Sequence, residues 1–585
     1  MDTQDQKILQ SKAQADDRQS LKTTCGQFWQ ISRAFFASER RHKARGFLIA
    51  LLMLALGVGG IQVLMSYAGR DFMTAIIRKN PAAYWMALGW YLGSFALAVP
   101  IGVFYRWVEE RLALLWREWM AQHLVKRYFN NRAYFRLRGS NSVDNPDQRI
   151  SEDVRNFTTS SLAFLLILLN SLVTLIAFIG VLWTISGTLV YLLVTYAIAG
   201  TAISIMIGRK LVRLHYHQYE KEADFRYGLV RVRDNAESIA FYRGEKREHL
   251  DLFNRLAGAV GNMRLIIIRN RRLGFFTNSY NYLALVLPIL VVAPMFMRGQ
   301  VEFGVVTQAA GAFAQVLAAF SLIITQFGGL SNYLASVQRL GSLWDQLDEH
   351  DLEEQRIASE EENTPTEDSR IVKLVKLDVC TPGNGRVLVR ELSFELRTHQ
   401  SLMIMGPSGT GKSSVLRTIA GLWYGGGGSL ERPAANQLMF LPQRPYMVEG
   451  SLREQLLYPY PGHGVPDDEI HKVVAEVNLS EVFARVDDDL DRVLDWSNVL
   501  SLGEQQRIAF ARLFLRKPRF AFLDEATSAL DEENQQDLYQ KIKCSGIGFI
   551  SVGHRSTLIH HHDRVLLLER SGAWEIRSGN DFKVG

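Results

Sequence analysis

Cysteine is scarce in this chain of 585 residues: only Cys25, Cys380 and Cys544 occur, far apart in sequence. Three distant cysteines exclude a disulfide framework and a clustered thiolate zinc site, and they fit a reducing compartment. Acidic and basic residues nearly balance, at 60 and 66. The basic residues form no single stripe with interleaved aromatic residues, so we expect no nucleic-acid partner.

Charge is missing altogether from several long segments in the first 340 residues. A bilayer core needs about 20 apolar residues per helix. One uncharged segment, 156–208, is long enough for two spans joined by a turn near residues 186–188. The sequence therefore predicts a polytopic all-α membrane domain with six helices, at about residues 46–69, 81–105, 159–184, 189–208, 274–297 and 303–328.

Lysine and arginine are distributed unequally between the two ends of these predicted spans. Segments 106–155 and 209–272 carry 10 and 15 of them, whereas the opposite ends carry only four. The positive-inside rule then predicts that both termini and the two long segments are cytosolic. The helical pattern of these segments predicts that the membrane helices continue into the cytosol as long arms. Residues 1–45 resemble neither a cleaved signal nor a transit segment, so we expect a bacterial inner membrane, with a eukaryotic organelle as the alternative.

An acidic segment separates two halves of different character. Residues 345–368 contain 11 acidic residues and one basic residue, which is typical of a solvated linker. Beyond it, charged and apolar residues mix as they do in a soluble domain. The expected domains are a cytosolic N-terminal segment (1–45), the membrane domain (46–340), an acidic linker (341–370) and an α/β domain (371–585).

A glycine-rich loop in the second half predicts a phosphate site. It follows the apolar strand 402–405 and precedes the apolar helix 415–422, which is the context that a P-loop requires. Backbone N–H groups of such a loop, the N-terminus of the next helix and a lysine bind phosphate oxygens, and a Ser hydroxyl is a ligand for Mg²⁺. The predicted ATP-binding residues are Gly406, Pro407, Ser408, Gly409, Thr410, Gly411, Lys412, Ser413 and Ser414.

A second apolar strand, 519–523, ends in Asp524 and Glu525. A carboxylate at the end of a strand can hold Mg²⁺, and a neighbouring carboxylate can polarise the attacking water. We assign Asp524 to the metal and Glu525 to general base or water positioning. The expected cofactors are ATP and Mg²⁺.

The segment 500–507 places Ser501, Leu502, Gly503 and Glu504 at the start of a helix, and it resembles the signature motif of ABC transporter ATPases. Leu502 and Glu504 stand where the family commonly has Gly and Gln. The resemblance covers the whole ATPase half and implies a role for three further residues: Gln443 as the Q-loop residue that senses Mg²⁺, Asp531 in the D-loop, and His554 as the switch histidine at the γ-phosphate. Thr381 occupies the position of the aromatic residue that commonly stacks on adenine.

The membrane half resembles ABC half-transporters of the D subfamily, the peroxisomal fatty-acyl and lysosomal cobalamin type, and their bacterial BacA-type relatives. Segments 145–153 and 235–244 carry this resemblance. It implies an exporter-like membrane domain followed by an α/β P-loop ABC ATPase domain, with Glu152 and Glu237 in coupling helices.

The resemblance implies ATP-driven transport of a bulky hydrophobic or amphipathic substrate by a homodimer in which each nucleotide lies between the P-loop of one subunit and the signature motif of the other. Fatty acids or their CoA thioesters, cobalamin and peptides remain open as substrates, and lipid is the surrounding partner. The alternative is an ATP-gated channel or membrane regulator that uses the same ATPase without uphill transport.

Overall fold

The computed structural model describes residues 23–139, 145–325, 327–360, 370–381, 385–423, 427–460, 464–486 and 489–581. The chain divides into two compact units. The first comprises residues 1–133 and 143–350, and the second comprises residues 134–142 and 351–585. Of the predicted N-terminal segment, residues 1–22 lie outside the described part of the chain, and so do residues 361–369 of the predicted linker.

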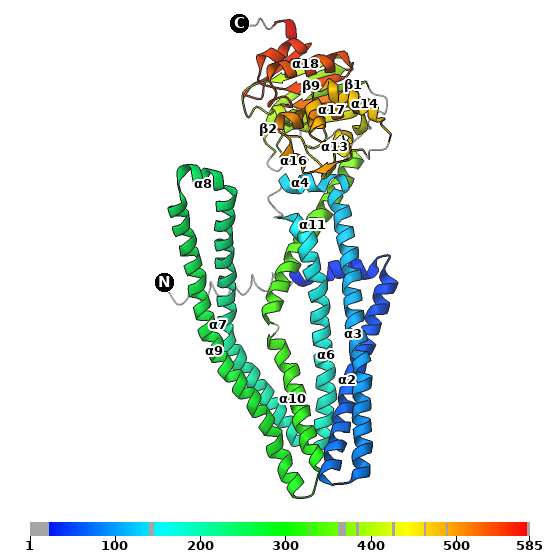
Figure 1. Ribbon diagram of the computed structural model, residues 1–585, viewed down its shortest axis with the longest axis vertical. Coiled ribbons are helices and arrows are strands. Elements are labelled where there is room, and N and C mark those ends of the chain that lie inside the picture. The colour runs from blue at the N-terminus through cyan, green and yellow to red at the C-terminus, as the bar shows by residue number, and fades with distance from the viewer. Residues whose placement is uncertain are drawn as a thin grey trace. The chain divides into compact units, whose positions relative to one another are not determined.

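The first unit is built from long helices (Figure 1). A helix over residues 23–37 comes first. It is followed by α2 (Arg41–Ile77), α3 (Pro81–Phe129), η1 (Asn130–Arg132), α5 (Pro146–Gln148), η2 (Arg149–Asp153), α6 (Val154–Ile185), α7 (Gly187–Asp234), α8 (Ala236–Tyr242), α9 (Glu245–Met297), α10 (Phe303–Thr325) and α11 (Phe327–Glu360).

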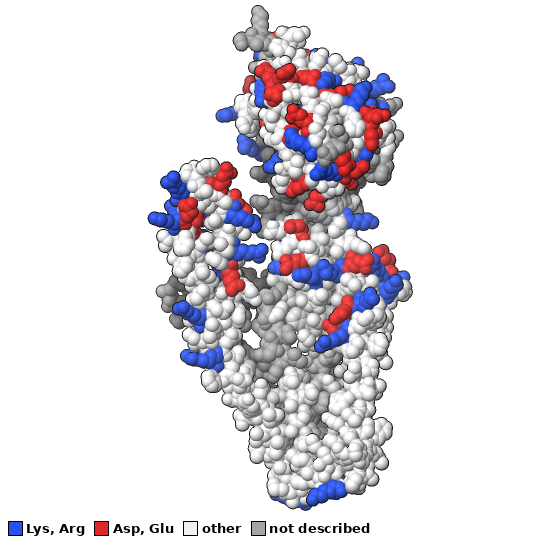
Figure 2. Space-filling model, viewed as in Figure 1, with Lys and Arg blue, Asp and Glu red and all other residues white. Residues whose placement is uncertain are grey.

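Six of the described helices are long and apolar enough to cross a membrane, as the sequence predicts. Figure 2 shows a broad surface of uncharged residues over the part of this unit that α2, α3, α6 and α10 share, with charges gathered beyond it. The predicted turn between the third and fourth spans is confirmed, because α6 ends at Ile185, Ser186 is extended, and α7 begins at Gly187. Part of the predicted acidic linker is helical, because α11 continues to Glu360.

The helices α7 and α9 run side by side as a long hairpin, and the short helix α8 closes its tip (Figure 1). They contain 48 and 53 residues, far more than a bilayer requires. The segment that the sequence predicts as a long helical arm is therefore helical. At the apolar end, residues of α6, α7, α9 and α10 pack into one buried cluster that includes Phe178, Leu193 and Phe313.

An ion pair joins the start of α6 to α11 within this unit. Arg339 donates to both carboxylate oxygens of Asp153, at 2.8 and 2.5 Å, and the Asp153 side chain is only 2% exposed. Arg149 adds a hydrogen bond of 2.8 Å to the Arg339 carbonyl. Two planar groups joined by two hydrogen bonds fix both distance and orientation, so this pair holds the two helices in register.

The described part of the second unit combines helices with three sheets, of which the smallest is the antiparallel pair β6–β7. A three-stranded antiparallel sheet has the order β2–β1–β4, and a six-stranded sheet has the order β11–β10–β3–β9–β8–β5 with only its edge strand β11 antiparallel. The strands are β1 (Ile371–Cys380), β2 (Val387–Arg397), β3 (Ser401–Met405), β4 (Ser429–Glu431), β5 (Leu438–Leu441), β6 (Gly450–Ser451), β7 (Val493–Leu494), β8 (Phe520–Asp524), β9 (Gly548–Val552), β10 (Arg564–Leu568) and β11 (Trp574–Ser578).

Helices cover the parallel sheet, whose central strands are apolar along their whole length. Strands of a parallel sheet have this apolar composition because both faces of the sheet are buried. The helices are α4 (Ala133–Gly139), α12 (Lys412–Ile419), η3 (Ala435–Gln437), α13 (Leu452–Leu457), α14 (Asp467–Glu476), α15 (Ser480–Ala484), α16 (Trp496–Val499), α17 (Leu502–Arg516), α18 (Glu532–Cys544), η4 (Ser556–His561) and η5 (Gly579–Asp581). The predicted fold class, membrane helices followed by an α/β P-loop domain, is confirmed.

Candidate functional site

The glycine-rich loop joins the buried strand β3 to α12, as the sequence predicts. Gly406 has φ +151°, and a Cβ there would lie 2.4 Å from the Leu568 carbonyl oxygen. Gly411, at φ +96°, begins α12, and a Cβ there would lie 3.1 Å from Leu388. Both positions therefore require glycine, and the loop wraps closely enough to present its backbone N–H groups to an anion.

Lys412 folds back over this loop. Its Nζ donates to the carbonyl oxygens of Gly406 and Pro407, at 2.8 and 2.9 Å. Burial lowers the pKa of Lys412, although the charges of Glu525 and Asp524 oppose this change. The ammonium group thus lies at the centre of the loop, where a bound phosphate would replace carbonyl oxygens with stronger anionic acceptors. Thr410, also in the loop, donates to the Pro407 carbonyl at 3.0 Å.

The second residue of α12 meets the end of β8. Ser413 Oγ donates to Asp524 Oδ1 at 2.8 Å, although the two residues are 111 positions apart. A hydroxyl and a carboxylate oxygen side by side are the hard oxygen donors that Mg²⁺ prefers. The structure therefore brings together two of the three predicted metal ligands, and their chemistry fits the cation.

The third predicted ligand contacts the predicted base instead. Gln443 Nε2 donates to Glu525 Oε2 at 2.9 Å, and His554 Nε2 lies 3.3 Å from Glu525 Oε1. Glu525 holds a positive φ of +50°, and its N–H donates to the Val552 carbonyl at 3.1 Å. One carboxylate thus lies between an amide and an imidazole, at the carboxyl edge of the parallel sheet where ligands of open α/β sheets bind.

Ser501 and Glu504 form a reciprocal cap at the start of α17. Ser501 Oγ accepts from the Glu504 N–H, and Glu504 Oε2 accepts from the Ser501 N–H at 2.8 Å. Arg485 also pairs with the Glu504 carboxylate. Burial favours the neutral acid, but the hydrogen bonds from Ser501 and the Arg485 charge outweigh it, so the pKa of Glu504 lies below its ordinary value. The glutamate at this position therefore completes a helix cap as an anion.

The other two residues of this motif differ in exposure and packing. A Cβ on Gly503 would lie 3.1 Å from the Ala529 carbonyl oxygen, so glycine allows α17 to approach the loop after β8. Leu502 is 40% exposed. Asp531 lies at the start of α18, where Oδ1 accepts from the Asn534 N–H at 2.7 Å. The structure thus gives Asp531 a capping role within its own chain.

Gln506 is a residue that the sequence argument does not single out. It is fully buried, and its Nε2 donates to the Gln443 carbonyl at 2.8 Å and to Ser528 Oγ at 3.1 Å. Its Oε1 accepts from the Ala529 N–H at 3.0 Å. One side chain of α17 therefore joins the loop that carries Gln443 to the loop that follows Glu525. Its place in the signature-like segment 500–507 was the only signal for it.

Two family models match the chain: ABC transporter transmembrane region 2 at residues 31–297 and ABC transporter at residues 389–528. An ABC transporter ATP-binding protein of Synechocystis sp. is 43% identical over 564 residues, which cover 94% of this chain and 85% of the relative. The chain belongs to the ABC transporter family. It is a half-transporter, and its ATPase domain binds ATP and couples hydrolysis to transport.

Its relatives include members of subfamily D. The chloroplastic ABC transporter D family member 2 of Arabidopsis thaliana is 39% identical over 622 residues, covering 96% of this chain and 88% of the relative. The human lysosomal cobalamin transporter is 35% identical over 498 residues, covering 80% and 82%. The fold is similar to that of a bacterial Atm1-family ABC exporter with ATP bound, with a TM-score of 0.71, 18% identity and coverage of 92% and 96%.

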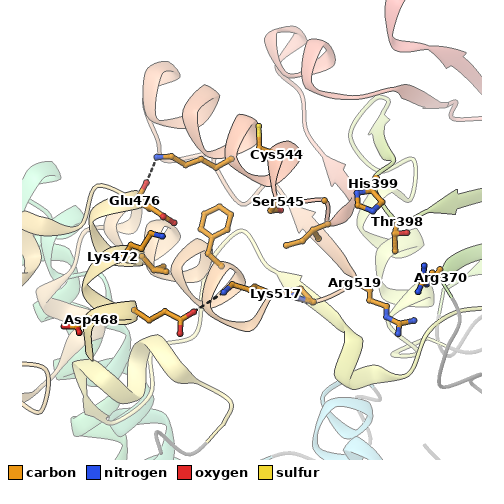
Figure 3. Close-up of a pocket in the computed structure, with 17 residues that line it drawn as sticks. Arg370, Thr398, His399, Asp468, Lys472, Glu476, Lys517, Arg519, Cys544 and Ser545 are labelled. Carbon is orange, nitrogen blue, oxygen red and sulfur yellow. Dashed lines mark hydrogen bonds and ion pairs between the residues drawn. The ribbon is translucent and has the colours of Figure 1, made fainter. Parts of the chain in front are cut away.

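Within this ABC ATPase domain, a second cavity of about 1040 Å³ lies at the opposite, amino-terminal edge of the parallel sheet (Figure 3). Several cations line it, but Lys517 pairs with Glu469 at 3.0 Å, and Lys541 pairs with Asp537. These ion pairs neutralise two of the cations that line the cavity.

The remaining predicted residues lie on the surface of their units. Glu152 belongs to the π-helical turn η2 and accepts from Gln148 at 3.2 Å, and Glu237 is exposed in the first turn of α8. Thr381, at the end of β1, donates its N–H to the Arg386 carbonyl at 2.9 Å.

Proposed function

We propose that two copies of this chain form a homodimer that uses ATP to move a bulky hydrophobic or amphipathic substrate across a membrane. The observation that carries this proposal is the meeting of Ser413 with Asp524, and of Gln443 and His554 with Glu525, in a chain that also has six candidate spans. The dimer would have 12 spans, twice the six of one chain.

The motifs of the chain support two ATP sites in the dimer, each of them built from residues of both subunits. Each copy supplies one P-loop and one signature motif, and the described side-chain hydrogen bonds of Ser501 and Glu504 are with each other and with Arg485. None of these partners belongs to the P-loop. The cap uses the N–H groups of Ser501 and Glu504, so we assign the N–H groups of Leu502 and Gly503, between them, to the nucleotide of a second subunit.

Each polar group of the site has an assigned role in hydrolysis. The loop Gly406–Ser414 and Lys412 bind the phosphates, Glu525 accepts a proton from the attacking water, and His554 orients Glu525 and contacts the γ-phosphate. Mg²⁺, held by Ser413 and Asp524 with Gln443 nearby, would neutralise charge on the phosphate oxygens. Gln443 and Asp531 would connect the site to the membrane unit and to the second subunit.

Coupling to the membrane is assigned to the tips of the helical arms. Glu152 lies in the turn before α6, and Glu237 lies in α8 at the tip of the α7–α9 hairpin. We place these tips, the N-terminus and the ATPase domain in the cytosol because lysine and arginine gather on that side. We place the protein in a bacterial inner membrane and propose domain limits of 46–340 and 371–585, with a linker at 341–370.

The transported substrate belongs to a chemical class rather than to one compound. The relatives include a lysosomal cobalamin transporter, and resemblance to subfamily D adds fatty acids, acyl-CoA thioesters and peptides. An ATP-gated channel is the second candidate, because a channel could use the same ATPase unit and the same spans.

The decisive experiment measures ATPase activity and uptake in proteoliposomes that contain the full-length protein. Acyl-CoAs, free fatty acids, cobalamin and peptides are added separately, and Glu525→Gln serves as the inactive control because it removes the carboxylate but keeps the shape. We expect one substrate class to stimulate hydrolysis and to accumulate against its gradient. The variant should bind ATP without turnover.

Two results would contradict the proposal. Downhill flux that ATP opens but cannot drive uphill would favour the channel. Near-normal hydrolysis by Glu525→Gln would remove Glu525 from its assigned role.

A further inference from the structure

A cavity of about 550 Å³ lies among α7, α9 and α10 of the membrane unit. Its volume is within the range of small-molecule sites. Leu285, Leu317 and Phe320 supply apolar wall, whereas Thr201, Ser204 and Asn281 supply polar groups. None of its described lining residues is charged. The cavity therefore combines an apolar wall with neutral hydrogen-bonding groups.

Three of these polar side chains have no protein partner among the described residues. Thr201, Ser204 and Asn281 make no side-chain hydrogen bond there, although all three lie in helices that the chain uses as candidate spans. Elsewhere in the spans, Asn170 donates to Tyr105 at 2.8 Å, and Ser161 bonds to Tyr333 at 2.8 Å, whereas the buried Ser171 hydroxyl also has no partner among the described residues. A polar group without a partner inside a membrane is costly and usually marks a functional site.

Tyr280 lines the cavity and is held in place by Tyr196. The rings of Tyr196 and Tyr280 stack at 4.3 Å with an angle of 1° between their planes. Each hydroxyl donates to the other residue's carbonyl, at 2.6 and 3.1 Å. Gly200 makes this contact possible, because a Cβ there would lie 2.2 Å from the Tyr280 ring. The two hydroxyls are used within the pair, so the free hydrogen-bonding groups of the lining belong to Thr201, Ser204 and Asn281, with the exposed Tyr282 hydroxyl beside them.

We propose that this cavity binds an uncharged amphipathic ligand, with an alkyl or ring body against the apolar wall and an amide, hydroxyl or carbonyl group at Thr201, Ser204 and Asn281. A charged head group would have to lose its hydration without meeting a counter-charge among the described lining residues, which is unfavourable. This inference rests on the proposed transport function and narrows its substrate class.

The test compares three radiolabelled ligands that share one alkyl chain and differ in the head group: dodecanamide, dodecanoate and dodecanoyl-CoA. Binding to the full-length protein in lipid nanodiscs is measured without ATP, and empty nanodiscs give the partition background. We expect dodecanamide to bind about tenfold or more tightly than either anion. Asn281→Leu should weaken dodecanamide binding about 3- to 10-fold, the loss of one hydrogen bond.

Ser204→Ala provides a second variant should Asn281→Leu fail to fold, and the same 3- to 10-fold loss is expected from it, on the order of one hydrogen bond. Ser171→Ala is the matched control, because Ser171 is buried in α6 and does not line the cavity. Its dodecanamide affinity should equal that of the wild type.

Equal or tighter binding of the anions, or unchanged dodecanamide affinity in the folded Asn281 and Ser204 variants, would overturn the inference. The binding assay needs no hydrolysis, so its failure is distinct from failure of the transport function. Dodecanamide binding without ATP-driven uptake of any substrate would retain this site and reject the transporter.

Discussion

Gln443 and Glu525, which are 82 positions apart, meet through a hydrogen bond of 2.9 Å from the Gln443 amide to the Glu525 carboxylate. Glu525 also sits 3.3 Å from His554. The orientation of the proposed base therefore depends on the loop that follows β5. Any displacement of that loop would turn the carboxylate as well.

Gln443→Leu tests this dependence. The change removes the donor but keeps a side chain of similar length, and a hydrogen bond to a charged group contributes about 1.5–3 kcal/mol. We expect ATPase turnover to fall about 10- to 100-fold, while ATP affinity changes little because the P-loop is intact. Steady-state kinetics with a separate nucleotide-binding measurement distinguish the two effects, and unaltered turnover would disconnect Gln443 from Glu525.

Gln506→Leu should slow hydrolysis without touching the nucleotide. It leaves the Gln443 carbonyl and the Ala529 N–H without their partner, and each lost buried hydrogen bond costs about 1–3 kcal/mol. We expect turnover to decrease at least about fivefold and the unfolding temperature to decrease too. The matched control is Gln540→Leu on the exposed face of α18. Equal activity of the two variants would show that the connection through Gln506 is dispensable.

Asp153→Asn should loosen the membrane unit. The carboxylate is 2% exposed and accepts two hydrogen bonds from Arg339, whereas Arg339 is half-exposed. We expect a loss of about 1–3 kcal/mol of unfolding free energy, measured as a lower thermal midpoint in detergent. Asp147→Asn, at an exposed carboxylate in α5, is the control and should shift the midpoint hardly at all. A midpoint like that of the control would contradict the structural role of the pair.

The buried side chain of His562 should make the stability of the ATPase unit depend on pH. Burial lowers the pKa of His562 to about 4, whereas the unfolded chain takes up the proton near the ordinary value of about 6.5. Between these values the unfolded state binds more protons, so stability falls as the pH falls from about 6.5 to 4. The loss is on the order of 3 kcal/mol.

The measurement is the thermal midpoint at pH 7 and pH 5 for the wild type and for His562→Gln. The variant also loses hydrogen bonds to Ser551 and Leu558, which lowers its midpoint at every pH. The quantity to compare is therefore the change of the thermal midpoint with pH. We expect a shallower slope in the variant. His560→Gln, at an exposed histidine, should keep the slope of the wild type, and identical slopes in all three proteins would exclude His562 as the source.

Local patterns in the sequence were sufficient to predict the phosphate loop and the carboxylates after β8. Each is a short apolar strand followed directly by its polar residues, so neighbours in sequence are neighbours in space. The six spans were predictable for a similar reason, because a bilayer imposes length and apolarity on each helix separately.

Contacts between distant segments were not predictable in this way. Asp153 and Arg339 are 186 positions apart, and each alone is an ordinary charge on a helix. Gln506 contacts residues 22 to 63 positions away. The predicted acidic linker also begins too early, because α11 continues to Glu360, and a helix continues through charged residues as readily as through apolar ones.

The α7–α9 hairpin has a mechanical consequence. At 1.5 Å per residue, the 48 residues of α7 extend about 72 Å, and a bilayer core takes up about 30 Å of this length. About 40 Å of rigid rod then remains beyond the membrane. A tilt of about 10° at the bilayer surface would carry α8 sideways by about 7 Å, which exceeds the 5.4 Å pitch of a helix. A small rotation among the membrane helices would therefore move the tip of the hairpin sideways by more than the pitch of one helical turn.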